Sequence, residues 1–453
     1  MVRRGLQAVG FEVTKREAFD KKRERLVGGQ YKQDNSVVMS TSPWFALPYP
    51  KPTKHVIVSG AGLAGCTTAW ALAQRGVKVT VLDAASAPAQ GGSGNPQGAL
   101  YAKLSVTPTK QSELHICGSH YSLNLLRHLD PEQTFWSECD VMQIATSSAE
   151  LKRQTNLLLH NAYPADVVGG ANQSALTDLI QQPVTADGLI MKLAGWVSPA
   201  EFCCALLEHP NIEWHGNSRL VSLQQDNGEW QLQVESGQQY RSGTVILCHA
   251  DATKQLEQTQ HLPLKPIRGQ VSTLPASVTD KHLQQVVCGE GYISPPYQDQ
   301  YCFGATFELH EQSTCVTASA HQTNLDNLAK ILPELAEDFV KSKHLLTGRV
   351  SFRCSTPDYL PVVGPAPDIS ATLQRFAPLR KDRNWQFPET EPAHLPGLYV
   401  NCGHGSKGLI TTPLCGEYLA SLICNEPLPL AKPLLDALNP CRFLIKDLIR
   451  KRI

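Results

Sequence analysis

A strand, a glycine-rich turn and a helix follow one another from residue 55, and this motif constrains the fold more than any other part of the chain. The segment HVIVSG leads into Gly60 to Gly65 (GAGLAG), and Asp83 ends the next strand-like segment, 18 residues after Gly65. In such a motif the first glycine makes the tight turn, the second admits a pyrophosphate to the helix N-terminus, and the third packs the helix on the strand. The carboxylate accepts hydrogen bonds from ribose hydroxyls. We therefore expect a βαβ unit that binds a dinucleotide with an unphosphorylated adenosine ribose, and a purely structural glycine turn is the alternative.

Length and composition describe a multidomain globular protein. The chain has 453 residues, which at about 100–200 residues per domain suggests two to four folding units. Its 41 basic residues equal its 41 acidic residues, so a uniformly basic nucleic-acid binder is excluded and any polyanion must meet a local patch. The 14 cysteines are scattered without a CxxC pair, which predicts reduced thiols and no metal site.

The N-terminal segment lacks the features of a targeting sequence. Residues 1–19 carry charges but no apolar core and no cleavage-like site, so they do not form a signal peptide. The uncharged stretch 56–73 has the length of a membrane span, but it contains the glycine motif. We expect a cytoplasmic protein that does not insert into a membrane.

Local patterns divide the chain near residue 50. Residues 1–30 combine a short helix-like piece with strand-like segments, and residues 31–53 contain four prolines and no helical periodicity, the composition of a linker. Further along, the patterns predict a helix at 199–208, hairpins at 219–237 and 291–307, a buried strand at 244–250 and one amphipathic helix at 325–343.

A second glycine turn lies near the end of the chain. The strand-like residues 399–402 lead into Gly403-His404-Gly405-Ser406-Lys407-Gly408-Leu409 and then into a helix through Leu422. Such a turn can aim backbone N–H groups at an electron-rich ring edge, where reduced flavin accumulates negative charge. Lys407 would add a positive charge there, and a solvated loop lysine is the alternative. This turn favours FAD over NAD.

The motifs together resemble a known family. Gly60 to Gly65 with Asp83, GYISP, FGATF (303–307) and 348–364 occur in the order found in glycine oxidase and D-amino-acid oxidase-like flavoproteins. The segments 93–105, 266–275 and 438–443 are similar to the FAD-dependent half of bifunctional enzymes that modify the wobble uridine of tRNA. Residues 6–28 resemble the closing strands of the methyltransferase half of the same enzymes.

The resemblance implies an α/β fold with a Rossmann-like FAD-binding domain and a second, sheet-based substrate domain, as in glycine oxidase. Residues 1–30 would be a remnant of the methyltransferase C-terminus, 31–53 a linker and 54–453 the oxidoreductase. Within the oxidoreductase, about 55–110, 190–265 and 345–450 would form the FAD-binding domain, and about 111–189 and 266–344 the substrate domain.

The resemblance also implies a set of site residues. Arg353, five residues before Asp358, would clamp a substrate carboxylate through its planar guanidinium. A structural ion pair with Asp358 or another acid is the alternative, and Arg349 is a weaker second choice for the clamp. Arg353 and Lys407 are the predicted catalytic residues. The predicted FAD contacts are Gly60, Ala61, Gly62, Gly65, Asp83, Ser93, Gly94, Asn95, Gln97, Gly98, Val221, Gly403, Gly405, Ser406, Lys407, Gly408 and Leu409.

Three departures from the family pattern matter. Relatives that attach flavin covalently use a cysteine seven residues before their aspartate, whereas Cys354 is four before Asp358, so we expect noncovalent FAD. Cys302 stands where some relatives carry a lysine near the flavin, which puts a fast reaction with oxygen in doubt. We assign no role to His249, which stands where the family has a glycine.

The implied reaction removes the carboxymethyl group from 5-carboxymethylaminomethyl-2-thiouridine at tRNA position 34 and gives 5-aminomethyl-2-thiouridine and glyoxylate. The methyltransferase step is expected to be absent, with a separate methyltransferase as a further partner. The alternatives are an oxidase or dehydrogenase of a small amino acid or secondary amine, and a non-catalytic flavoprotein that binds RNA. We expect tRNA, not DNA, to contact one of three basic segments: 15–25, 442–453, or Arg380, Lys381 and Arg383 with Trp385.

Overall fold

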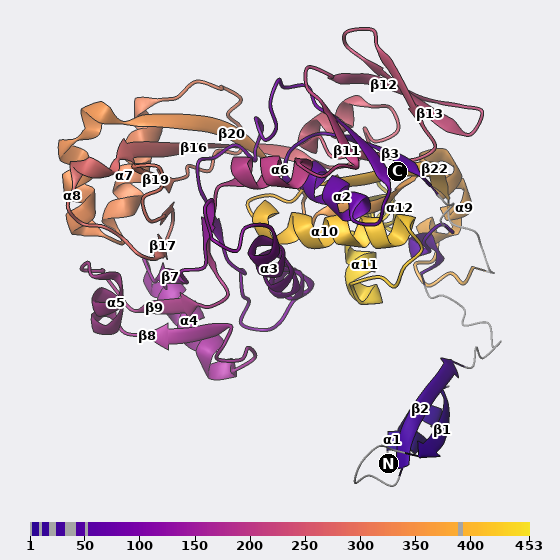
Figure 1. Ribbon diagram of the computed structural model, residues 1–453, viewed down its shortest axis with the longest axis horizontal. Helices are drawn as coiled ribbons and strands as arrows, with labels where there is room; N and C mark the ends of the chain where they lie inside the picture. Colours follow the sequence, from indigo (N-terminus) through magenta and orange to yellow (C-terminus); the bar gives the residue numbers. More distant parts are fainter. Residues whose placement is uncertain (1, 9–10, 18–23, 32–41, 50–52, 388–392) are drawn as a thin grey trace.

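A computed structural model describes residues 2–8, 11–17, 24–31, 42–49, 53–387 and 393–453. Near the N-terminus, α1 (Val2–Ala8) contacts the first strand of an antiparallel pair, β1 (Phe11–Glu17) and β2 (Glu24–Tyr31). Figure 1 shows this small unit apart from the main body of the protein. The short helix-like piece followed by strands is therefore confirmed for this segment.

A six-stranded sheet forms the centre of the first half of the body. Its first five strands run parallel, and the last pairs antiparallel with its neighbour. In spatial order the strands are β11 (Ile212–His215), β4 (Lys78–Leu82), β3 (His55–Ser59), β15 (Val245–Leu247), β22 (His394–Cys402) and β21 (Val362–Pro367).

Helices cover this sheet and bury nearly continuous apolar strands. The long α10 contacts both α2 and α3, and α2 also contacts α6. Figure 1 shows α10 crossing beneath the sheet, with α11 below it. The helices of this half are α2 (Leu63–Ala73), α3 (Lys110–Leu129), α6 (Pro199–Leu207), α9 (Ile369–Arg375), α10 (Gly408–Ile423), α11 (Lys432–Leu438) and α12 (Arg442–Ile449).

Two three-stranded sheets flank the parallel sheet. One is the meander β12 (Leu220–Asp226), β13 (Glu229–Val234) and β14 (Gln239–Ser242), in which the predicted hairpin at 219–237 is confirmed. The other has the order β5 (Gly98–Leu100), β10 (Gly195–Val197) and β6 (Trp136–Ser137), and it joins segments far apart in the sequence.

An eight-stranded sheet forms the other half of the body and lies on the left of Figure 1. Helices α7 (Ala318–Ala329) and α8 (Pro333–Lys341) pack on it with a core that includes Phe303 and Phe339, and α4 (Ser148–His160) and α5 (Gln173–Ile180) lie near its far edge. In spatial order the strands are β20 (Thr347–Ser355), β16 (Lys265–Pro275), β19 (Gln300–Gly304), β18 (Tyr292–Ile293), β17 (Val286–Cys288), β7 (Val141–Ile144), β9 (Gly188–Met191) and β8 (Val168–Ala171).

One predicted element is wrong. The segment 325–343 is not one helix, because α7 ends at Ala329 and α8 begins at Pro333. Proline has no N–H for a helical hydrogen bond but is tolerated in the first turn, so it starts the second helix. The helix at 199–208, the buried strand at 244–250 and the hairpin at 291–307 are confirmed as α6, β15 and the pair β18–β19.

Two elements, α3 and β20, do not lie in the half of the body that was predicted for their residues. Helix α3 lies in the segment predicted for the substrate domain, but its apolar residues belong to the same core as the parallel sheet. Strand β20 lies in a segment predicted for FAD binding, but it pairs with β16 in the eight-stranded sheet. No helix of the described residues is long and apolar enough to cross a membrane.

Candidate active site

A cavity of about 1060 Å³ lies where the carboxyl ends of four parallel strands meet strand β20. Gly60 follows β3, Asp83 follows β4, His249 follows β15 and Gly403 follows β22, and all four line the cavity. Ligands of open parallel sheets bind at this edge, where neighbouring connections run to opposite faces. The two glycine turns, more than 300 residues apart in the sequence, therefore meet in one site.

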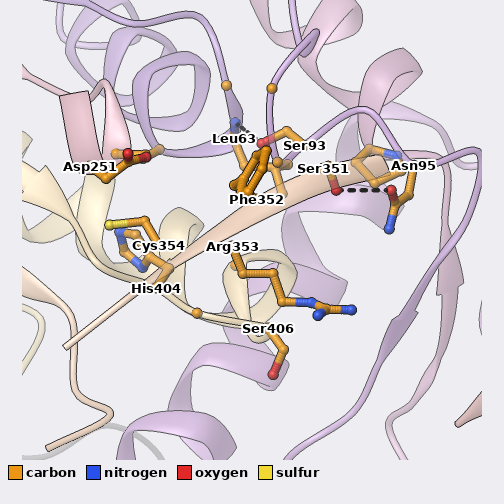
Figure 2. Close-up of a pocket in the computed structure, with 18 of the residues that line it drawn as sticks. Leu63, Ser93, Asn95, Asp251, Ser351, Phe352, Arg353, Cys354, His404 and Ser406 are labelled. Carbon is orange, nitrogen blue, oxygen red and sulfur yellow. Dashed lines mark hydrogen bonds between the residues drawn. The ribbon is translucent and has the colours of Figure 1, made fainter. Parts of the chain in front are cut away.

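The first turn is shaped by close backbone approach. Gly60 has φ +111°, and a Cβ atom at Gly65 would lie 1.7 Å from the Gly60 carbonyl oxygen, so the third position of the motif excludes a side chain. Helix α2 begins after Gly62 with no side-chain cap from that residue. Ser93 Oγ accepts a hydrogen bond from the Leu63 N–H at 3.0 Å (Figure 2). This end of the helix presents backbone N–H groups and a hydroxyl to an anion such as a pyrophosphate.

Asp83 is held by backbone donors at the end of β4. Its Oδ2 accepts from the Ala61 N–H at 2.6 Å and its Oδ1 from the Ala85 N–H at 2.8 Å. A carboxylate has about four acceptor sites, so both oxygens retain capacity for ribose hydroxyls. Asp83 lines the cavity beside the α2 turn, and its contact with an adenosine ribose stays a prediction.

The second turn is fixed by a half-buried histidine. His404 Nδ1 lies 2.9 Å from Thr411 Oγ1, and its Nε2 lies 2.9 Å from Asn401 Oδ1. Burial lowers the pKa of His404 to about 3, so the ring is neutral and acts as a brace between β22 and α10. Helix α10 begins after Lys407 without a side-chain cap, and Gly405, at φ +58°, adopts a conformation that favours glycine.

Lys407 is half-buried at the cavity wall, which does not match the alternative of a fully solvated loop lysine. Its Nζ donates to the Tyr101 carbonyl oxygen at 3.2 Å and lies 3.1 Å from the centroid of the Tyr101 ring. No carboxylate of the described chain forms an ion pair with it, and burial lowers the pKa of Lys407 to about 7. The amine therefore changes charge in the physiological range while it faces the α10 end of the cavity.

Arg353 presents an unpaired guanidinium to the same cavity. It leaves β20 on the side opposite to Phe352 (Figure 2), and its Nη1 donates to the Thr306 carbonyl oxygen at 3.0 Å. Within the described residues no carboxylate forms an ion pair with it, and burial lowers the pKa of Arg353. Most of its five N–H donors are consequently available to a bound anion.

Neighbouring residues explain why Arg353 does not form an ion pair with Asp358. Asp358 pairs with Arg442, whose Nε and Nη2 lie 2.9 and 3.0 Å from the two carboxylate oxygens, so the alternative of an Arg353–Asp358 ion pair is wrong. Gly269 on the adjacent strand makes room for the side chain, because a Cβ atom there would lie 2.5 Å from Arg353 Nη1. The PIRGQ segment thus contributes the space that the guanidinium occupies.

Arg349 fixes the loop that follows the first βαβ unit. Its Nη2 donates to the carbonyl oxygens of Gln90 and Gly91 at 2.6 and 2.7 Å, and its Nη1 lies 3.4 Å from Asn95 Oδ1. Ser351 Oγ approaches the same amide oxygen at 3.5 Å (Figure 2). Arg349 lines the cavity, but its donors are occupied by this loop, which makes it a poor second choice for the substrate carboxylate.

Most predicted contact residues line the cavity. Ala61, Gly65, Gly94, Gln97 and Val221 do not; Val221 is 47% exposed, and its neighbours 218–220 line the cavity in its place. Those that do are Gly60, Gly62, Asp83, Ser93, Asn95, Gly98, Arg353, Gly403, Gly405, Ser406, Lys407, Gly408 and Leu409.

Several lining residues were not predicted. Tyr101 and Tyr292 line the cavity, and Tyr292 donates to the Gln97 carbonyl oxygen at 2.8 Å. The sequence contains one signal that Ser351 lines the cavity. Arg349, Ser351 and Arg353 alternate along a strand and so share a face. No local pattern indicates that Tyr101 lies under Lys407.

Comparison with known proteins identifies the family to which the chain belongs. The family model described as FAD dependent oxidoreductase matches residues 55–422. The chain is 38% identical over 99% of its length to "tRNA 5-methylaminomethyl-2-thiouridine biosynthesis bifunctional protein MnmC" of Chromohalobacter salexigens, and 39% identical over 100% of its length to the protein of the same name from Chromobacterium violaceum. It spans 65% and 68% of the lengths of these two relatives, respectively.

Solved structures support the fold. Glycine oxidase from Geobacillus kaustophilus superposes with a TM-score of 0.67 at 18% identity, covering 84% of this chain and 98% of that one. Iminodiacetate oxidase from Chelativorans sp. BNC1 gives a TM-score of 0.66 at 20% identity, covering 85% and 98%. The predicted architecture, a Rossmann-like domain with a sheet-based second domain, is confirmed. The chain belongs to the family of FAD-dependent oxidoreductases, and FAD is its cofactor.

Proposed function

We propose that this enzyme oxidises the carboxymethylamino group of 5-carboxymethylaminomethyl-2-thiouridine at the wobble position of tRNA. The products would be 5-aminomethyl-2-thiouridine and glyoxylate. The observation that carries the proposal is the half-buried guanidinium of Arg353, which no carboxylate of the described residues pairs with, in a cavity whose other wall consists of the two glycine turns. The names of the relatives supply the tRNA and the formation of 5-methylaminomethyl-2-thiouridine, and the carboxymethylamino group of the substrate is what the family resemblance of the sequence implies.

The proposed reaction oxidises a C–H bond next to a secondary amine. FAD, when bound, would supply the oxidant that takes up a hydride, one proton with two electrons, from the substrate methylene. The substrate then becomes an imine, R–CH₂–N=CH–COO⁻, having lost one C–H hydrogen and one N–H proton. Addition of water splits the imine into R–CH₂–NH₂ and glyoxylate, so atoms and electrons balance.

Arg353 would orient the reacting methylene by holding its carboxylate. A planar guanidinium can bind a carboxylate through two parallel hydrogen bonds, which fixes both position and plane. Because the methylene is bonded directly to that carboxylate, fixing the anion also fixes the C–H bond. Burial of Arg353 strengthens the contact, since fewer waters compete for the donors.

Lys407 would place a positive charge at the α10 end of the cavity in its protonated form. The charge of this residue depends on pH near neutrality because burial lowers the pKa of Lys407 to about 7. A negative charge that develops nearby favours the protonated amine and is stabilised by it. The proposed oxidation needs no side-chain acid or base in direct contact with the substrate amine, provided that the amine binds neutral.

Two of the three predicted basic segments come together, which supports a tRNA partner. Arg380 Nε donates to the Ile453 carbonyl oxygen at 2.9 Å, and the short helix η5 (Ala377–Arg380) packs on α12. The basic residues of 380–383 and 450–452 therefore lie close together, with Asp382 and the Arg452 partner Asp447 among them, although about 70 residues separate the two ranges in the sequence. The segment 15–25 lies in part outside the described residues.

We place the enzyme in the cytoplasm, where tRNA is modified.

Nucleoside analysis tests the proposal directly. The FAD-loaded protein is incubated with tRNA that carries the carboxymethylaminomethyl nucleoside, and the digested tRNA is separated by liquid chromatography with mass detection. We expect conversion to the aminomethyl nucleoside with an equal amount of glyoxylate. Unchanged tRNA together with turnover of glycine, sarcosine or iminodiacetate would favour an oxidase of small amines. A flavin that none of these substrates reduces would favour a non-catalytic flavoprotein.

A further inference from the structure

An aromatic ring stands at the edge of the cavity beside the unpaired guanidinium. Phe307 is 58% exposed, yet it lines the large cavity, and its ring centroid lies 6.0 Å from Arg353 Cζ. Phe307 also lines a second, smaller cavity of about 460 Å³ next to the first. Single exposed apolar side chains are common on protein surfaces, so the position beside Arg353 is what distinguishes this one.

The backbone around Phe307 is anchored on both sides. Arg353 donates to the Thr306 carbonyl oxygen, and the Thr306 N–H donates to the Gln270 carbonyl oxygen at 3.1 Å. On the other side, Glu308 and Arg268 exchange two backbone hydrogen bonds of 3.0 Å and pair through their side chains at 2.9 Å. The exposed ring is thus presented from a fixed backbone, so little ordering cost remains when a ligand packs on it.

The charge of this segment points to a base as its ligand. Residues 305–317 contain two glutamates and neither lysine nor arginine. Glu308 is paired with Arg268, whereas Glu311 is exposed and would repel a phosphate. The Phe307 ring itself is a flat, apolar surface, and single-stranded RNA bases are bound by stacking on such side chains.

We propose that Phe307 stacks on the uracil ring of the wobble nucleotide while Arg353 holds the carboxylate of its substituent. This rests on the proposed function. Four single bonds separate the uracil C5 atom from the carboxylate carbon, roughly 5 Å in extended form. A base attached to a carboxylate on Arg353 therefore reaches a ring that lies 6.0 Å from that guanidinium. The stack would select a nucleoside over a free amino acid.

Variants at one position separate stacking from folding. We expect Phe307→Ala to raise the KM for tRNA roughly 5-fold to 100-fold, the effect of losing one aromatic stack, and Phe307→Trp to restore it. Leu309→Ala is the matched control, because Leu309 is 57% exposed on the same segment but lines neither cavity. Binding of iminodiacetate, read from the flavin absorbance, should be the same in the wild type and Phe307→Ala, since this ligand has a carboxymethylamine and no base.

The outcomes are distinct. An unchanged KM in Phe307→Ala, or equal losses in Phe307→Ala and Leu309→Ala, would overturn the stacking role. Weaker iminodiacetate binding in Phe307→Ala would also overturn it, because Phe307 would then act by positioning Arg353. Failure of the wild type to convert tRNA is a different result and would overturn the proposed function itself.

Discussion

Asp358 and Arg442 form a two-pronged ion pair that joins the turn after β20 to the start of α12. The Arg442 side chain is 9% exposed and the Asp358 side chain 32%. Burial acts to raise the pKa of Asp358, but the hydrogen bonds and charge of Arg442 lower this pKa overall. A carboxyl group with a lowered pKa stabilises the fold at neutral pH, and this contribution is lost as the pH falls through the lowered pKa.

We predict that Arg442→Ala destabilises the FAD-loaded protein by roughly 2–3 kcal/mol, somewhat below the cost of breaking a fully buried pair. Urea unfolding at pH 7 measures this loss. The control is Arg452→Ala, which removes an exposed pair with Asp447 and should cost roughly 0–1 kcal/mol. The difference between wild type and Arg442→Ala should shrink on acidification, as Asp358 becomes protonated; a difference independent of pH would contradict the assignment.

Removal of Arg353 should abolish tight substrate binding without loss of flavin. We predict that Arg353→Ala lowers kcat/KM for the carboxymethylated nucleoside by about 30-fold to several thousand-fold, since a buried, charge-assisted contact contributes roughly 2–5 kcal/mol. Gly269→Ala should lower it as well, because the added methyl group would collide with the guanidinium. Steady-state kinetics and the flavin-to-protein ratio measure the two effects. Wild-type kcat/KM in a flavin-loaded Arg353→Ala protein would disprove the role.

Arg349 should control flavin retention. We predict that Arg349→Ala speeds FAD dissociation roughly 10-fold, because the 90–95 loop loses the hydrogen bonds that hold it to β20, each worth roughly 1 kcal/mol. The measurement is release of flavin fluorescence after dilution. Arg241→Ala is a suitable control, since Arg241 lies on the surface strand β14 and does not line the cavity. Equal dissociation rates in both variants would show that the loop does not depend on Arg349.

Lys407 should give the reduction of the flavin a dependence on pH. The lysine is protonated below its pKa of about 7 and neutral above it, so its positive charge is present at pH 6 and largely absent at pH 8.5. We predict that Lys407→Met slows anaerobic reduction by substrate about 10-fold at pH 6 and much less at pH 8.5. Stopped-flow absorbance at both pH values measures it. The same slowing at both would indicate a packing defect.

The flavin should be released by acid. Cys354 lines the cavity, but burial raises the pKa of its thiol, which keeps it protonated and weakly nucleophilic. We predict that acid precipitation leaves a colourless pellet and a yellow supernatant. Flavin that remains with the pellet in wild type and is released in Cys354→Ser would establish a covalent bond.

The parts of the site that follow from local geometry could be predicted from the sequence. The turn at Gly60 and the position of Asp83 depend on a strand, a turn and a helix that are adjacent in the chain, so their spacing is sufficient. Arg353 was found by its distance from Asp358, although that aspartate pairs with Arg442, more than 80 residues further on. The partner of a charged residue depends on tertiary packing, which spacing does not encode.

Other parts depend on contacts between distant segments. Tyr101 meets Lys407 only because α10 returns across the loop after β5, and Phe307 meets Arg353 only because β16 holds β20 and the 304–308 segment together. The break at Pro333 was visible as a proline, but the apolar periodicity continues on both sides of it. The periodicity therefore led to the prediction of one continuous helix at 325–343, although a proline inside that range stops a helix.

Strand β20 sets the distance between Arg349 and Arg353 in the active site. It carries Arg349, which holds the loop of residues 90–95, and Arg353, which lines the cavity where we propose that the substrate binds, four residues further on. In an extended chain this spacing is about 13 Å, and it cannot be changed by a small step, because inserting one residue would turn one of the two side chains to the opposite face. Relatives that act on a longer or shorter carboxylate substrate are therefore expected to relocate the cationic group to another element, and to keep the length of this strand.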